Sequence, residues 1–277
     1  MTLAIAVVAG ALIGLSLGAL GGGGSVLAVP ALVYGLGQSA AQATTGSLLV
    51  VGLTSLSGAI TAHRSGNVLL SRGLAFGAIA IGGAAVGARA SGLVPQPVLL
   101  AAFAALLLLV AAVMTARQIR SRRTGPAPRI EDNAGSPIVS FRPALACDCA
   151  RAFMVLVTAT VVGLLTGFLG VGGGFLVVPA LVLALGLPMR YAAGTSLVVI
   201  TVTSATALAV RAGGGVHPAW GLVALLTVVA VTGGWAGARL AARTDTRRLQ
   251  TAFTVLLLLV AGFTASRAIP PLIAPIS

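Results

Sequence analysis

The chain has 277 residues, of which 58% are hydrophobic and only 8% are charged, and its mean hydropathy is +1.09. Soluble domains carry roughly 25% charged residues, so this composition excludes a water-soluble globular protein. Basic residues outnumber acidic residues by 17 to 4, and all of the basic residues are Arg. Because they lie almost entirely between apolar runs, they indicate membrane topology, and we expect no nucleic-acid partner.

The first apolar segment, residues 3–36, is interrupted by the glycines Gly21–Gly24. A continuous helix of that length would extend for about 51 Å, which is too long for one crossing of a bilayer core about 30 Å thick. The twelve residues after the glycines, 25–36, are too few for a second crossing. The segment therefore either crosses once or enters the membrane and returns to the same side.

Three ordinary spans are predicted next, at about 44–62, 73–93 and 97–116. Residues 117–151 are rich in Arg and Pro and contain three of the four acidic residues, so we predict a linker there. Its Cys147 and Cys149 are too close in sequence for good disulfide geometry and too few for a closed metal site, and no metal or cofactor is expected.

The second half of the chain repeats the first. A shift of 149 residues places Gly18–Gly37 on Gly167–Gly186, with 13 of 20 positions identical. A second glycine-broken segment at 152–186 is followed by spans at about 192–211, 218–240 and 249–268. The prediction is an all-α polytopic membrane protein with a first repeat at 1–116, a linker at 117–151 and a second repeat at 152–277. Each repeat has four to five segments and starts with a glycine-broken helix.

The distribution of Arg distinguishes the two topologies. If each broken segment crosses once, Arg residues divide 11 to 6 between the two sides of the membrane, whereas in-and-back segments divide them 14 to 3. The positive-inside rule favours the second arrangement, which inverts one repeat relative to the other. In both topologies the linker is cytoplasmic, and the expected location is a bacterial plasma membrane.

Both repeats contain the pattern G-x-L-G-x-G-G-x-x-x-x-V-P-A-L-V, at 18–33 and 167–182. It is followed by Gly194-Thr195-Ser196 in the second repeat and by Thr45-Gly46-Ser47 in the first. These duplicated motifs resemble those of the sulfite exporter (TauE/SafE) family. The resemblance implies a permease for sulfite, organosulfonates or related sulfur-containing or carboxylate anions, without identifying the substrate.

The glycine clusters are candidate binding elements. They could simply allow close helix packing, but consecutive glycines also break a helix and expose N–H groups that an anion can bind at the next helix start. Pro30 and Pro179 are expected in the first turn of that half-helix. Hydroxyls of the following span either bond to their own helix or donate to the anion. The candidate substrate-binding residues are Gly21, Gly23, Gly24, Ser25, Thr45, Ser47, Gly170, Gly172, Gly173, Gly174, Thr195 and Ser196.

His63, Arg64 and Arg211 lie at predicted span ends, where they act as interfacial anchors or attract the anion. No acidic residue lies in a predicted span, which argues against the interpretation of the chain as a carrier of protons or other cations. No nucleophile, acid–base pair or metal cluster is recognisable, so we expect no enzyme. An anion channel of the same architecture and a non-transporting membrane assembly factor remain alternatives, and homo-oligomerisation stays open.

Overall fold

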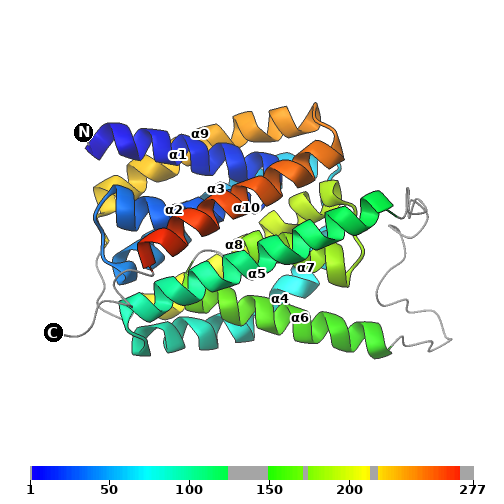
Figure 1. Ribbon diagram of the computed structural model, residues 1–277, viewed down its shortest axis with the longest axis horizontal. Helices are drawn as coiled ribbons and strands as arrows, with labels where there is room; N and C mark the ends of the chain where they lie inside the picture. The colour runs from blue at the N-terminus through cyan, green and yellow to red at the C-terminus, as the bar shows by residue number, and fades with distance from the viewer. Residues whose placement is uncertain (1, 124–148, 171–173, 213–217, 269–277) are drawn as a thin grey trace.

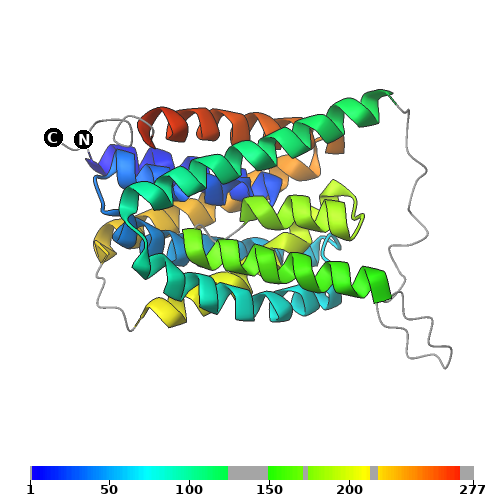
Figure 2. The ribbon, with the colours of Figure 1, turned by 60° about the horizontal axis from the view of Figure 1, so that its bottom comes forward.

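A computed structural model describes residues 2–123, 149–170, 174–212 and 218–268. The described residues form ten α-helices and no strand (Figures 1 and 2). The α-helices are α1 (Thr2–Leu20), α2 (Gly23–Pro30), α3 (Ala40–Arg64), α4 (Leu70–Ala90), α5 (Gln96–Arg123), α6 (Cys149–Leu169), α7 (Gly174–Ala184), α8 (Met189–Arg211), α9 (Trp220–Ala242) and α10 (Thr246–Ala268). A π-helical turn, η1 (Ala31–Gly35), follows α2, and a 3-10 turn, η2 (Ser91–Leu93), follows α4.

Six of the described helices are long and apolar enough to cross a membrane, namely α1, α3, α4, α5, α8 and α9. Large apolar side chains on the outside of the bundle have no protein cover, as shown by the exposed fractions of Val86 (60%), Val228 (64%) and Leu259 (66%). In water such a surface would aggregate, whereas lipid tails solvate it. The predicted all-α, multi-pass membrane fold is therefore confirmed.

The first glycine-broken segment is a hairpin. Gly24 of α2 packs on the backbone of α1 at Ile13 and Leu17, and Gly35 at the end of η1 lies beside Ile5, near the start of α1. The thirteen residues of α2 and η1 extend for only about 20 Å. The chain therefore goes into the bundle along α1 and returns along α2 to the side where α1 begins.

Equivalent helices of the two repeats run in opposite directions. Gly52 of α3 faces Ser204 of α8, and Gly58 faces Leu197, so residue numbers rise on one helix as they fall on the other. Since α3 and α8 are counterparts under the 149-residue shift, the two repeats are inverted relative to each other. Figure 1 shows the consequence: α1 begins and α10 ends at one end of the bundle, while α5 ends and α6 begins at the other. We call these ends the termini side and the linker side.

The two repeats interlock through their first helices. α1 packs in parallel along α9 of the other repeat, and α6 packs in the same way along α4. Small residues allow these contacts: a Cβ on Gly14 would lie 2.0 Å from the carbonyl oxygen of Ala230, and one on Gly163 would lie 2.2 Å from that of Ala80. Such close backbone approach is a usual way of packing helices in a membrane.

The helix boundaries depart from the sequence predictions in two informative places. α3 begins at Ala40 because Ser39 and Gln42 form a capping box, in which the Ser39 hydroxyl accepts from the Gln42 N–H and the Gln42 side chain accepts from the Ser39 N–H, each at 3.3 Å. The helices α5 and α6 extend into both ends of the predicted linker, whose residues 124–148 lie outside the described part.

The expected position of the prolines is wrong. Pro30 is the last residue of α2, and Pro179 lies in the interior of α7, so neither is in the first turn of its half-helix. Proline removes a backbone N–H and clashes with the carbonyl of the preceding turn. In the first repeat the helix responds by widening into the π-helical turn η1 directly after Pro30.

Candidate functional site

The tips of the two hairpins have the same geometry. Gly21 and Gly170 both adopt a positive φ, +72° and +64°. A Cβ on Gly21 would lie 2.3 Å from the carbonyl oxygen of Ala193, and a Cβ on Gly170 would lie 2.4 Å from the Cβ of Thr44. Ala193 and Thr44 are themselves counterparts in the repeat. Both the backbone conformation and the space therefore require glycine at these two positions.

Each tip is capped by a hydroxyl from the other repeat. The Ser196 hydroxyl lies 2.9 Å from the Gly21 carbonyl oxygen and 2.7 Å from the Ala193 carbonyl oxygen of its own helix, and it donates to both acceptors. The Ser47 hydroxyl has the same relation to the carbonyl oxygens of Gly170 and Thr44. Both serines are fully buried. Ser47 and Ser196, which were predicted as anion donors, therefore already have acceptors, and in this conformation they fix the tips.

The remaining predicted binding residues are held mainly by local contacts. Gly22 packs directly on Gly174 of the other tip, and Gly23 packs between Leu20 and Leu256. Three hydroxyls have partners: Ser25 donates to the Gly22 carbonyl, Thr45 donates to the Ala41 carbonyl, and Thr195 accepts from the Leu69 N–H. Gly172 and Gly173 lie outside the described residues.

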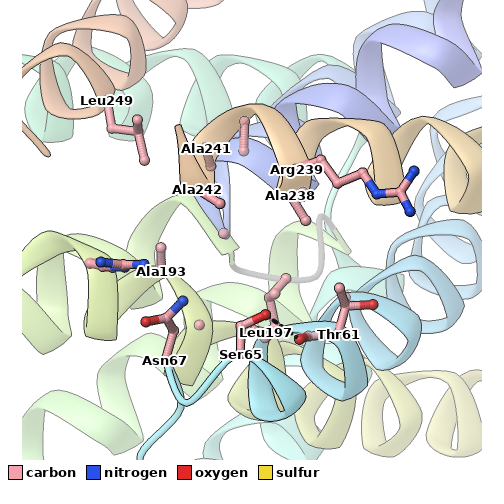
Figure 3. Close-up of a pocket in the computed structure, with 17 residues that line it drawn as sticks. Thr61, Ser65, Asn67, Ala193, Leu197, Ala238, Arg239, Ala241, Ala242 and Leu249 are labelled. Atoms are coloured by element: carbon pink, nitrogen blue, oxygen red, sulfur yellow. Dashed lines mark hydrogen bonds between the residues drawn. The ribbon is translucent and has the colours of Figure 1, made fainter. Parts of the chain in front are cut away.

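A cavity of about 150 Å³ opens at the linker side of the bundle. It lies between the ends of α1, α3 and α9 and the starts of α8 and α10, and it is adjacent to the Gly21 tip. In Figure 3, Thr61, Ser65 and Asn67 gather on one wall, opposite Ala241 and Ala242. A cavity of this size in another protein holds a benzene molecule, so it can hold a small ion or metabolite.

The described lining of this cavity is positively charged. It contains Arg190 and Arg239 and no acidic residue. The Arg239 guanidinium is stacked on the Trp235 ring, 3.5 Å from its centroid, and it points away from the cavity centre in Figure 3. The lining does not include His63 and Arg64, which are exposed at the end of α3. The electrostatic field at the mouth therefore favours anions.

Arg211, at the end of α8, lies at the opposite end of the bundle. Its guanidinium donates to the hydroxyls of Thr44 (2.9 Å) and Ser91 (2.7 Å) and to the carbonyl oxygen of Gly167 (2.9 Å), and it lies 3.5 Å from that of Phe168. It thereby joins α3, α6 and η2 to α8. Arg211 is thus half-buried on the termini side, where its hydrogen bonds hold these helices together.

The cavity lies at the position in one repeat that corresponds to the position of the Arg211 side chain in the other. Under the repeat, Arg211 corresponds to Ala62, which lines the cavity. The second repeat has one inserted residue before Gly237, so Gly87–Ala90 corresponds to Gly237–Leu240 at a shift of 150. With this alignment the partners of Arg211 correspond to further cavity-lining residues, namely Gly18, Ala19, Ala193 and Ala241. The same structural position is therefore occupied by a guanidinium on the termini side and open on the linker side.

The apolar contacts show the same asymmetry. Leu48, Ala88 and Ala207 form a small buried cluster on the termini side. Their counterparts are Leu197, Ala238 and Gly58, all of which line the cavity. At this pair of equivalent positions the described bundle is therefore closed on the termini side and open on the linker side, although the two repeats share their architecture.

The family model described as Sulfite exporter TauE/SafE matches residues 6–264 of this chain. The chain belongs to the TauE/SafE family. A probable membrane transporter protein of Xylella fastidiosa (strain Temecula1) is 32% identical over 200 residues, which cover 72% of this chain and 70% of that protein. The probable membrane transporter protein YunE of Bacillus subtilis is 29% identical over 269 residues, 93% of each chain. No solved structure matches this TauE/SafE chain significantly.

Of the predicted substrate-binding residues that the structure of this TauE/SafE protein describes, Gly21 alone lines the cavity. The polar lining residues Thr61, Ser65 and Asn67 and the cations Arg190 and Arg239 were not predicted. One signal was available: the comparison of Arg211 with its repeat counterpart Ala62 identifies a charged side chain that only one repeat has.

Proposed function

We propose that this chain is a permease for small anions, with sulfite, organosulfonates and related sulfur-containing or carboxylate anions as the substrate class. Membership of a membrane transporter family supports the transport activity. The observation that carries the anion specificity is the cavity lined by Arg190 and Arg239, with no acidic residue in its described lining.

The asymmetry between the two sides supports a carrier that exposes its site alternately. Inverted repeats can exchange conformations, so that the open side of one state becomes the closed side of the other. Here the linker side has the cavity, and the termini side is closed by Arg211 and the Leu48 cluster. A second state would have Arg211 withdrawn and the Gly58–Leu197 contact tightened.

The orientation follows from the Arg residues. In the in-and-back topology fourteen of the seventeen fall on the linker side, and only Arg89, Arg211 and Arg267 fall on the termini side. The positive-inside rule then makes the linker side cytoplasmic in a bacterial plasma membrane. In this orientation the cavity takes up or releases the anion at the cytoplasmic face.

Transport can be tested in proteoliposomes of the full chain. We expect saturable uptake of labelled sulfite, thiosulfate, ethanesulfonate or acetate, with at least one of these anions transported well above empty liposomes. A neutral molecule of similar size, acetamide, serves as the negative control. Uptake of none of the anions, by protein whose fold in the vesicles is verified by circular dichroism, would refute the proposal.

The same vesicles distinguish a carrier from a channel. A carrier preloaded with unlabelled anion exchanges it for external label and accumulates the label transiently, because empty and loaded sites reorient at different rates. A channel equilibrates the label without such an overshoot. The closed termini side favours the carrier.

A further inference from the structure

Two buried serines differ from every other serine and threonine on α3 and α8, because their hydroxyls have no hydrogen-bond partner. Ser55 on α3 and Ser204 on α8 have exposed fractions of 0% and 1%, and neither hydroxyl has a hydrogen-bond partner. They are counterparts under the 149-residue shift. The other serine and threonine hydroxyls of α3 and α8 all have a partner: Thr44, Thr45, Ser47, Thr54, Ser57, Thr61, Thr195, Ser196, Thr201, Thr203 and Thr206.

A serine in a membrane helix ordinarily donates to a carbonyl of the preceding turn. Ser57 and Thr206, which are also counterparts, do so at 2.8 Å and 2.9 Å. Buried polar groups without partners are rare, and here the same exception occurs at the same position of both repeats. The paired exception points to a ligand that both hydroxyls are placed to bind.

The two serines lie on the path between the open and closed sides. Ser204 of α8 faces Gly52 of α3: its Cβ lies 3.3 Å from the point that a Cβ on Gly52 would occupy. Ser204 therefore lies in the interface between α3 and α8, which we call the seam. Ser55 is one helical turn from Gly58, which lines the cavity. Gly58 contacts Leu197 of α8, and both residues line the cavity, so this end of the seam borders the cavity. Farther on, the Leu48 cluster closes the termini side.

The starts of the half-helices face the same region. Gly174, the first residue of α7, packs on Ile200 in the middle of α8, and Ser204 is one turn farther along α8. Because α7 runs antiparallel to α8, its N-terminus faces toward that turn. In the first repeat α2, the counterpart of α7, likewise contacts α3, the counterpart of α8. The positive ends of two helix dipoles therefore favour negative charge at the centre of the seam.

We propose that Ser55 and Ser204 form a central binding site for a small oxyanion, which reaches it from the cavity. The site deepens the proposed function and rests on it. Two neutral hydroxyl donors and two helix N-termini would hold an anion without a buried cation, so the anion could leave again toward either side. The inverted repeat presents equivalent donors to both entrances.

The first test measures transport by hydroxyl-deletion variants. In proteoliposomes we expect Ser55→Ala and Ser204→Ala each to raise the half-saturation concentration for the transported anion of the panel by roughly threefold to tenfold, as one lost hydrogen bond would. The double variant should raise it further. Ser57→Ala and Thr206→Ala, which delete hydroxyls bonded within their own helices, should stay within about twofold of the wild type. An unchanged half-saturation concentration in the double variant would overturn the proposal.

The second test does not depend on transport. In a background with Cys147→Ser and Cys149→Ser, the Ser55→Cys and Ser204→Cys variants are treated with a sulfonate-bearing methanethiosulfonate and with its uncharged methyl analogue, and labelling is followed by intact mass. We expect the anionic reagent to label Ser55→Cys at least tenfold faster than Ser57→Cys. Labelling by the uncharged reagent only would show that the seam admits water or neutral molecules, and the anion site would be refuted.

The two tests separate the failure of this site from the failure of the proposed function. Wild-type transport with unaffected serine variants refutes the central site alone. Absence of wild-type transport of every anion of the panel refutes the proposed function, and the labelling result then still decides whether anions enter the seam.

Discussion

The Ser196 hydroxyl donates a hydrogen bond to the Gly21 carbonyl oxygen at 2.9 Å, and this bond joins the second repeat to the tip of the first. The last carbonyl groups of a helix receive no hydrogen bond from an N–H of the same helix, so inside a membrane they need donors from elsewhere. Ser47 supplies the same cap to Gly170 of the other tip. Each broken helix is therefore held in the bundle by the repeat that it does not belong to.

Removal of this cap should destabilise the protein. We expect Ser196→Ala to lower the free energy of unfolding by about 1–3 kcal/mol, because the buried Gly21 carbonyl loses its donor. The midpoint of thermal unfolding in detergent measures the effect. Thr206→Ala, on the same helix, removes a hydroxyl that bonds only within α8 and is the matched control. Equal midpoints for the two variants would contradict the capping role.

Glycine substitution at the tip should be far more damaging than at an open turn. Gly21→Ala places a Cβ 2.3 Å from the Ala193 carbonyl oxygen in addition to straining a positive φ, and we expect loss of folded protein from the membrane. Gly37 also has a positive φ, +67°, but a Cβ there would meet nothing within 4 Å. Gly37→Ala should thus cost only about 1–2 kcal/mol of conformational strain. Similar yields of folded protein, measured by size-exclusion chromatography, would contradict this difference.

The sequence predicts the fold well because membrane composition and the repeat are strong signals. Each span is identified to within several residues. The earlier start of α3, at Ala40, comes from the Ser39–Gln42 capping box. The in-and-back path of the glycine-broken segments also follows from the chain, through the uneven distribution of Arg and the short piece after Gly24. The packing of Gly24 on α1 shows the physical basis of that path.

The sequence predicts the site less well, because the repeat hides the asymmetry that creates it. A comparison of the repeats selects residues that are the same in both, such as Ser47 and Ser196. The cavity depends on a difference between the repeats, because Ala62 of the first repeat corresponds to Arg211 of the second. Which hydroxyls are already bonded is also decided in three dimensions. The Ser196 acceptor is 175 residues away in the chain, so no local pattern reveals it.

Arg211 should control access from the termini side. Replacement of Arg211 by Ala removes four contacts that join α8 to α3, α6 and η2, and we expect the termini side to open more often. The measurement is the labelling rate of an Ala207→Cys reporter, in the buried Leu48 cluster, by an impermeant anionic thiol reagent applied to that side, in the background without native cysteines. Arg89→Ala removes an exposed Arg near Ser91 and should leave the rate unchanged. A rate unaffected by Arg211→Ala would show that other contacts close this side.

The orientation in the membrane can be tested with fusions. The helix α1 begins and the helix α10 ends on the side that we expect to be Arg-poor, so a reporter that is active only in the cytoplasm should be silent when fused after Ser277. The same reporter inserted near Gly125 in the linker should be active. An active fusion after Ser277 would reverse the orientation proposed for the cavity.

The last prediction uses the difference between the repeats directly. Ala62→Arg places a guanidinium at the position that corresponds to Arg211, beside the cavity-lining residues Gly18 and Ala19. We expect it to fill the cavity and reduce anion transport at least tenfold, while the protein still inserts and folds.

The charge-matched control is His63→Arg, which adds a cation at the neighbouring, exposed position without filling the cavity. The counterparts of the Thr44 and Ser91 hydroxyls are missing on the linker side, where Ala193 and Ala241 stand. Ala193→Thr and Ala241→Ser should therefore restore the two hydrogen bonds that Arg211 makes to hydroxyls, and raise the thermal stability of the Ala62→Arg variant. Transport by Ala62→Arg at the rate of His63→Arg would mean that the anion does not pass through this cavity.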